Sequence, residues 1–323
     1  MKSIIWMIQP GMEPYARCQQ SAWMQALEAE GWSVRVQHHQ PRVPWRSTSS
    51  AEWLIWNFVP TPLDVWIARL FAGRQMAVLS ELNNKVYSLP RLDQWCVPSE
   101  SMRMHLVDCG VSRDKIEIVQ GYAPSKSKMM PDVRGQVGRD ENSPVIYASG
   151  PLVPSTGNRL AIWFFSIMQY MRPGISLLLQ RDGPERERLE RMADGICTKG
   201  SVRFAANDIP AHELVAQADI VCLPLAEDGV PDALFAALSQ AKPIVATQQP
   251  SLMEWLRHDV NGVLIPTNRP PTWAAVMDQL LHDTERIQRL RAGARMTAIP
   301  SARLKLPAVF CQTAVPHVAL AAA

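Results

Sequence analysis

The chain alternates short apolar runs with amphipathic stretches, and this alternation stops once before it starts again. Apolar runs such as Ile4–Ile8 and Trp53–Phe58 have the length and composition of buried strands. Amphipathic stretches such as Ala16–Glu30 have the apolar spacing of helices. A strand followed by a helix, repeated along a chain, is typical of parallel sheets covered by helices. We therefore expect an α/β protein.

The interruption covers residues 123–143, which hold two prolines, two glycines and few apolar residues. Such a segment between two runs of βα units is typical of a linker between domains. The sequence therefore predicts a first domain over residues 1–125, a linker over 126–143 and a second domain over 144–299. Residues 300–323 form an Ala- and Pro-rich tail for which no helix or strand is predicted.

Composition excludes several classes of protein. A net charge of +3 over 323 residues gives no indication of nucleic-acid binding. No apolar run approaches the length of a membrane-spanning helix, and the first residues lack the apolar region of a signal peptide. The six cysteines have neither metal-binding nor redox spacing. We therefore expect a cytoplasmic protein with buried, reduced thiols and no metal site.

The most specific segment lies in the second half, from Asp228 to Thr247. It begins with a polar turn, Asp228-Gly229-Val230-Pro231, and continues as an apolar helix expected over residues 232–240. Lys242-Pro243 then ends the helix and leads into an apolar strand, Ile244–Thr247. A turn that places polar groups at a helix N-terminus suits a ligand with anionic or hydroxyl groups.

This loop–helix–strand unit resembles the donor-sugar motif of retaining family 4 glycosyltransferases, which have the GT-B fold. Other segments match that family in order and spacing: Gly110–Gly121, Gly150–Gly157, Leu178–Leu189 and Glu254–Pro266. The resemblance covers residues 100–295 well and the preceding residues loosely. It implies two Rossmann-like domains that face each other across a cleft, with the acceptor held by the first and a nucleotide-sugar donor by the second.

The resemblance also implies which residues contact the donor. Asp228 stands at the position of a carboxylate that contacts the donor sugar, and it is the candidate catalytic residue. No metal or cofactor is implied, because cationic side chains stabilise the leaving diphosphate in this family. The remaining positions carried over from the motifs form the candidate donor site: Gly11, Gly150, Thr156, Arg181, Gly183, Glu227, Gly229, Val230, Pro231, Asp232 and Ala233.

Three of the charged positions in the family pattern are not charged in this chain. The arginine and the lysine that would bind phosphate fall on Pro151 and Thr156, and the carboxylate that would hold the ribose falls on Ala236. Arg159 and Arg181 lie nearby in the sequence and could substitute for the missing cations. Without such substitution, donor affinity is expected in the millimolar range, and restoring all three charged residues is expected to strengthen it.

The sequence thus favours a glycosyltransferase that moves a sugar from a nucleotide diphosphate to a glycan or lipid-linked acceptor, with peripheral membrane contact open. The alternative is a degenerate member that binds a glycan, a nucleotide or a partner protein without catalysis. A GT-B epimerase is a third hypothesis, but the acid and base residues that such an enzyme needs are not evident in the sequence. Donor binding distinguishes the first two.

Overall fold

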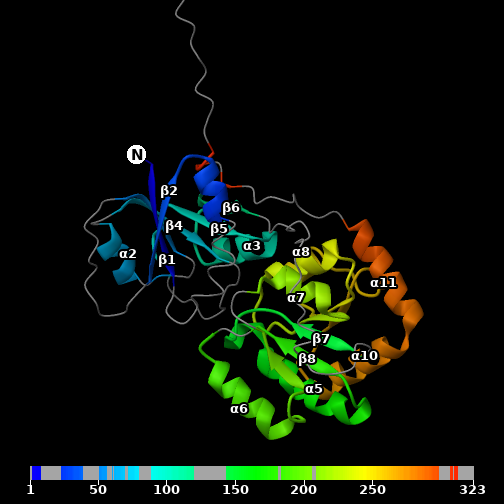
Figure 1. Ribbon diagram of the computed structural model, residues 1–323. Coiled ribbons are helices and arrows are strands. Elements are labelled where there is room, and N and C mark those ends of the chain that lie inside the picture. The colour runs from blue at the N-terminus through cyan, green and yellow to red at the C-terminus, as the bar shows by residue number, and fades with distance from the viewer. Residues whose placement is uncertain are drawn as a thin grey trace, which may run out of the picture.

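The computed structural model describes two parallel six-stranded sheets, one from each half of the chain (Figure 1). The described residues are 2–8, 23–38, 51–56, 60, 62–69, 72–79, 89–119, 143–180, 183–205, 209–297, 306–307 and 309–311. No strand pairs with a strand of the other sheet in these ranges. The expected α/β class is confirmed. The predicted linker lies outside the described residues apart from Ser143, so its boundaries stay a prediction.

The first sheet has the strand order β2-β1-β3-β4-β5-β6, and all its neighbouring strands are parallel. Its elements are β1 (Ser3–Ile8), β2 (Ser33–His38), β3 (Ala51–Trp56), α2 (Pro62–Ala68), β4 (Ala72–Val78), β5 (Gln94–Val97), α3 (Glu100–Asp108), a 3-10 turn (Arg113–Lys115) and β6 (Ile116–Ile118).

The second sheet has the order β12-β11-β10-β7-β8-β9 and is also parallel. Counted from β7, this is the 3-2-1-4-5-6 order of the Rossmann fold. Its strands are β7 (Val145–Ala148), β8 (Ser176–Leu179), β9 (Val202–Phe204), β10 (Ile220–Leu223), β11 (Ile244–Thr247) and β12 (Val263–Ile265). Its helices are α5 (Asn158–Met171), α6 (Arg186–Ile196), α7 (Ala211–Gln217), α8 (Asp232–Ser239), α9 (Pro250–Met253), α10 (Pro270–His282) and α11 (Thr284–Met296), and Pro154–Thr156 form a 3-10 turn.

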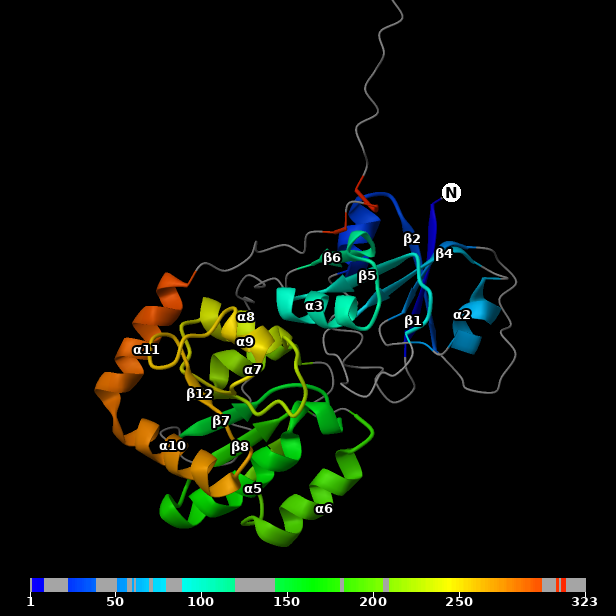
Figure 2. The ribbon, with the colours of Figure 1, turned by 180° about the vertical axis from the view of Figure 1, so that it is seen from behind.

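Both faces of the inner strands of the second sheet are buried, which explains why these strands are apolar runs, whereas the edge strand β9 carries the exposed Arg203. Alternate residues of β7 enter different clusters: Val145 and Tyr147 pack in the cluster that contains α7 and α8. Ile146 and Ala148 pack in the cluster that contains α5 and α10. Within the second cluster, the rings of Phe164 and Trp273 stack with centroids 5.6 Å apart. The two layers of helices therefore fix the sheet from both sides (Figure 2).

The tail contains a buried contact that the sequence did not predict. Phe310 is fully buried and packs in a cluster of the first domain that includes residues of β2 and β3, and Figure 1 shows the red segment against the blue part of this domain. Its ring centroid lies 5.4 Å from those of Trp32 and Trp53. The indole N–H of Trp32 donates to the carbonyl oxygen of Phe310 over 3.1 Å. The chain thus returns to the first domain after completing the second.

The expectation of buried thiols is correct for some cysteines and wrong for others. All five described cysteines are free, and Cys96 and Cys222 are buried. Cys109 and Cys311 are exposed, because Cys109 ends α3 at the surface and Cys311 follows the inserted Phe310. No helix among the described residues is long and apolar enough to span a membrane.

Candidate functional site

The strand order of the second sheet reverses between β7 and β10, and we call the place where the loops after these two strands meet the crevice. The chain runs from β7 through α5 to β8 on one side, whereas β10 begins the other half of the sheet. The loops that follow β7 and β10 therefore leave the sheet in opposite directions, and ligands of open parallel sheets bind at such a point. The two sequence segments with donor-site character, around Gly150 and Asp228, are these two loops.

The two loops contact each other through backbone groups. The N–H groups of Ala226 and Glu227 donate to the carbonyl oxygen of Ser155 over 2.8 Å and 3.3 Å. Gly157 has a φ of 70°, and a Cβ atom there would lie 1.7 Å from the carbonyl oxygen of Pro224. A glycine is therefore required for the loops to approach this closely.

The position of the expected phosphate-binding lysine is occupied by a side chain that turns inward. The hydroxyl of Thr156 lies 2.7 Å from the carbonyl oxygen of Pro151 and 2.8 Å from that of Val153. The Asn158 amide donates to the same Pro151 oxygen and to the Thr156 hydroxyl. Thr156 and Asn158 are both buried. These two side chains therefore close the loop onto itself and supply no positive charge.

Two candidate glycines border this loop. Gly150 has a φ of 105°, and its N–H donates to the Gln180 side chain over 3.2 Å. Gly183 has a φ of 137°, and a Cβ atom there would lie 2.4 Å from the Leu152 carbonyl oxygen. Gly183 thus lets the loop after β8 pack on the loop after β7. Its backbone proximity to a diphosphate stays a prediction.

The motif residues at the start of α8 divide between the crevice and the core. Pro231 precedes the first residue of α8, and Gly229 is buried just before it. Val230 and Ala233 are buried in the hydrophobic cluster under α8. A donor contact at these two positions would therefore come from the backbone. Ala236, the position of the expected ribose carboxylate, lies in the same cluster and is only 1% exposed.

Asp228 lies where the two domains meet, and its carboxylate accepts hydrogen bonds from both. Oδ1 accepts from the backbone N–H of Ser251 over 3.0 Å, and Oδ2 accepts from the Ser251 hydroxyl over 2.8 Å. Oδ2 also accepts from the hydroxyl of Ser101, at the start of α3 in the first domain, over 3.1 Å. The sequence placed Asp228 at a domain contact only through the resemblance, and it gave no indication of its partners.

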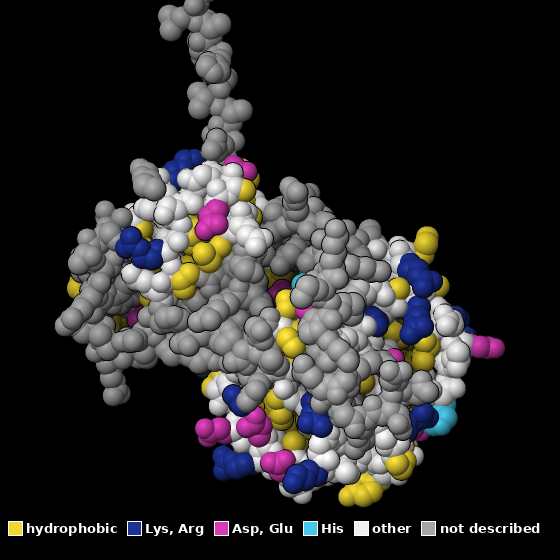
Figure 3. Space-filling model, in the orientation of Figure 1, with side chains coloured by type: hydrophobic (Ala, Val, Ile, Leu, Met, Phe, Trp, Pro, Cys, Tyr) yellow, Lys and Arg dark blue, Asp and Glu magenta, His cyan; other side chains and the backbone are white. Residues whose placement is uncertain are grey.

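Of the two arginines that could replace the missing anchors, only Arg159 belongs to the described residues. Arg159 is exposed on the first turn of α5. Arg181 and Gly11 lie outside the described residues. On the face in Figure 3, Lys and Arg side chains alternate with Asp and Glu around the second domain. Where side chains are described, no group of three His, Cys, Asp or Glu residues could hold a metal ion.

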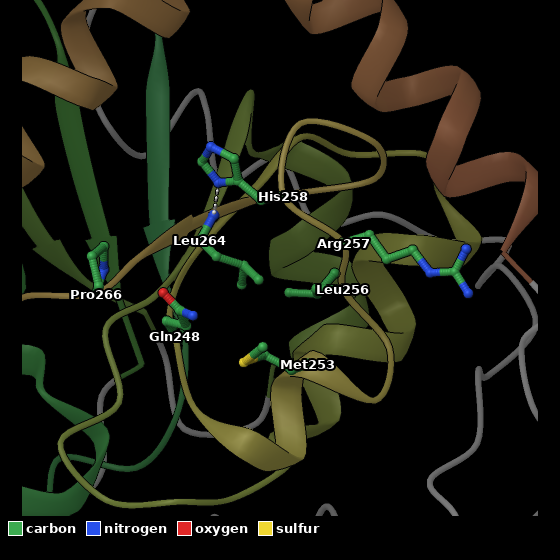
Figure 4. A pocket seen from close by; sticks show the side chains of 7 residues that line it. All are labelled: Gln248, Met253, Leu256, Arg257, His258, Leu264 and Pro266. Atoms are coloured by element: carbon green, nitrogen blue, oxygen red, sulfur yellow. Dashed lines mark hydrogen bonds between the residues drawn. The ribbon is translucent and has the colours of Figure 1, made fainter.

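A separate pocket of about 470 Å³ lies at the carboxyl ends of β11 and β12 (Figure 4). The imidazole Nδ1 of His258 accepts from the Leu264 backbone N–H over 3.0 Å at its margin. None of the predicted donor residues lines this pocket. Its lining residues are Gln248, Met253, Leu256, Arg257, His258, Leu264 and Pro266. Arg257 points away from the other labelled side chains in Figure 4.

Residues 129–297, just over half of the chain, match the family model described as glycosyl transferases group 1. The chain belongs to this family. A lipopolysaccharide core biosynthesis glycosyltransferase of Rhizobium meliloti is 22% identical over 194 residues, which cover 59% of this chain and 55% of that protein. A D-inositol 3-phosphate glycosyltransferase of Jonesia denitrificans is 35% identical over 81 residues, covering 25% of this chain and 19% of its own. The chain spans about half the length of the first of these relatives.

Two solved glycosyltransferase-related structures share the fold over most of both chains. The Anabaena protein HepE, solved in complex with UDP and glucose, superposes with a TM-score of 0.63 at 16% identity, covering 91% of this chain and 94% of its own. WaaG, a glycosyltransferase involved in lipopolysaccharide biosynthesis, gives a TM-score of 0.62 at 14% identity, and the superposition covers 90% of this chain and 94% of WaaG. The predicted GT-B fold, with two Rossmann-like domains, is therefore confirmed.

One residue of the candidate donor site has an unusual ionisation. Burial raises the pKa of Asp232, the first residue of α8, from 3.8 to about 6. A helix N-terminus favours a negative charge, so burial outweighs that effect here. Between about pH 4 and 6 the folded protein holds a proton that the unfolded chain has released. The contribution of Asp232 to stability is therefore largest below about pH 4 and is lost as the pH rises to about 6.

Replacing Asp232 by asparagine should remove this pH-dependent cost. At about pH 8 we expect the Asp232→Asn variant to be more stable than the unmodified protein by on the order of 2–3 kcal/mol, since each pKa unit corresponds to about 1.4 kcal/mol. The gain should disappear near pH 4. Urea unfolding at several pH values measures the gain at pH 8 and its loss near pH 4. Asp194→Asn, on the exposed side of α6, is the control. A gain that is the same at every pH would contradict this assignment.

Proposed function

We propose that the chain is a glycosyltransferase that moves a sugar from a nucleotide diphosphate to a glycan or lipid-linked acceptor. The observation that carries this proposal is the coincidence of the donor motif with the β7–β10 crevice. Two backbone loops and the start of α8 meet there, beside a carboxylate able to accept hydrogen bonds from sugar hydroxyls. UDP and UDP-glucose are bound by the solved neighbour HepE, which makes a UDP-sugar a reasonable first donor to test.

The second candidate function, binding without catalysis, is supported by the same loops. The Thr156 hydroxyl is hydrogen-bonded to carbonyl oxygens of its own loop, and the Ala236 side chain is buried. Two of the three uncharged anchor positions therefore have no direct access to a donor through their side chains. Cations at Arg159 or Arg181 would have to stabilise the diphosphate for transfer to occur.

Calorimetric titration with UDP-, GDP- and ADP-sugars tests the proposal. We expect one nucleotide sugar to bind with a Kd of about 1 mM, equivalent to about −4 kcal/mol. Asp228→Asn should reduce sugar release from that donor at least tenfold and leave the affinity for the free nucleoside diphosphate unchanged, because Asp228 is assigned to the sugar. A micromolar Kd would show that other cations replace the missing anchors. Failure of every nucleotide sugar to bind would contradict the proposal.

The retaining stereochemistry belongs to the same proposal. We expect donor hydrolysis to release the sugar first in the anomeric configuration that it has in the donor. Proton NMR during hydrolysis measures the first-formed anomer before mutarotation. The opposite anomer would contradict a retaining mechanism and leave the donor class unaffected.

A further inference from the structure

The start of α3 in the first domain is bound by a carboxylate from the second. Glu254, directly after α9, accepts from the backbone N–H groups of Glu100 and Ser101 over 3.1 Å and 2.8 Å. The first N–H groups of a helix have no partner within the helix and carry partial positive charge. A carboxylate at this place therefore makes charge-assisted hydrogen bonds that join the two domains.

A chain of hydroxyl groups runs beside this contact and ends at Asp228. The Ser99 hydroxyl accepts from the Met102 N–H over 3.1 Å and lies 2.7 Å from the Ser251 hydroxyl. Ser251 has a single hydroxyl proton and donates it to a carboxylate oxygen of Asp228. Ser99 must then donate to Ser251. The direction of the Ser99–Ser251 hydrogen bond is therefore set by the acceptor at Asp228.

The carboxylate at the end of this chain is the one that the donor motif places at the sugar. Its Oδ2 atom already accepts two hydroxyl protons, one from Ser251 in its own domain and one from Ser101 in the other. A sugar hydroxyl that donates to Oδ2 would meet an oxygen whose two acceptor positions are taken. Ser101 is the partner that can leave without changing the second domain.

We propose that Glu254 and Asp228 form an interdomain latch on the start of α3, and that a donor sugar opens its Asp228 half by replacing the Ser101 hydroxyl. Glu254 holds the domains together without ligand, and Asp228 is shared between domain contact and sugar binding. The second half of this inference rests on the proposed function, since it assigns Asp228 to the donor. Figure 2 shows α3 beside α9, where the latch lies.

The Glu254 half of the latch is tested without any ligand. Small-angle X-ray scattering should give a larger radius of gyration for Glu254→Ala than for the unmodified chain at low ionic strength. The unmodified chain should approach the variant as salt is added, because the contact is exposed and is screened. Glu285→Ala is the matched control, since Glu285 is exposed on α11 of the same domain. Ser99 still caps α3 in the variant. An unchanged radius would overturn the latch.

The Asp228 half is tested by comparing UDP-glucose with UDP. Ser101→Ala should tighten UDP-glucose binding by about tenfold, the effect of one hydrogen bond to a charged group, and leave UDP binding unchanged. Ser112→Ala is the matched control, because Ser112 also donates to a carboxylate, that of Asp114, within the first domain. An unchanged or weakened UDP-glucose affinity in Ser101→Ala would overturn the competition.

The two measurements separate this inference from the proposed function. If neither the unmodified chain nor Ser101→Ala binds UDP-glucose or UDP, the assignment of this donor and the competition at Asp228 both fail. The scattering comparison still decides whether Glu254 holds the domains. If UDP-glucose binds but Glu254→Ala and Ser101→Ala change nothing, the proposed function stands and the latch is wrong.

Discussion

Replacing Ala236 by glutamate is expected to destabilise the second domain rather than to restore a donor anchor. The sequence resemblance implies a carboxylate at this position, but the Ala236 side chain is 1% exposed within the cluster formed by α7, α8 and the sheet. A glutamate there would carry an unpaired charge into the core. We expect a loss of roughly 3–5 kcal/mol at neutral pH, the range for a buried charge without a partner.

Two further variants separate the charge from the volume of the new side chain. Ala236→Gln adds the same bulk without a charge, so its cost measures overpacking. Burial raises the pKa of a carboxyl group, and the difference between the Glu and Gln variants should therefore shrink toward about pH 5. Ser239→Glu, on the exposed side of the same helix, should cost less than about 1 kcal/mol. Thermal and urea unfolding measure all three.

A stable Ala236→Glu variant with improved donor binding would contradict the placement of this side chain in the core. If Ala236→Glu unfolds at the same temperature as the unmodified chain and also binds UDP-glucose more tightly, its carboxylate reaches the crevice. The missing ribose anchor would then be the main defect of the donor site. The simultaneous replacement of Pro151, Thr156 and Ala236 by charged residues would be worth making only after that result, because Pro151 and Thr156 are buried as well.

The strands could be predicted from the sequence because each is a local apolar run. Ile244–Thr247 has the predicted bounds, because both faces of its strand are buried and the run is bounded by Pro243. Ser99 directly before α3 is of the residue type that caps helices, and its side chain accepts from the Met102 N–H. Short helices carry less signal. Pro250–Met253 was missed because four residues are too few to show helical periodicity.

The parts of the site that could not be predicted depend on contacts between distant residues. Ser101 and Asp228 are separated by 127 residues, and no spacing or composition indicates that their side chains meet. Phe310 lies in an Ala- and Pro-rich tail, and only the position of Trp32 and Trp53 on the first sheet explains its burial. The resemblance likewise assigned Ala236 to the position of a carboxylate but could not show that its surroundings are apolar.

Gly157→Ala is the second variant from which we expect a large effect. A Cβ atom at Gly157 would lie 1.7 Å from the Pro224 carbonyl oxygen and 2.8 Å from the carbonyl carbon. Both are backbone atoms directly after β10, so no side-chain rotation relieves the clash. The φ of 70° adds the cost of a left-handed conformation. We expect a loss of about 4 kcal/mol or more, measured by urea unfolding.

Gly110→Ala separates the two causes of this loss. Gly110 has a φ of 89°, similar in sign to that of Gly157, but nothing lies within 4 Å of an added Cβ atom. Its replacement should therefore cost only about 1–2 kcal/mol, the cost of the backbone conformation alone. The difference between the two variants measures how firmly the loops after β7 and β10 are held together. If Gly157→Ala costs no more than Gly110→Ala, the Pro224 loop moves freely, and the crevice between these loops is not the rigid donor site that the proposed function requires.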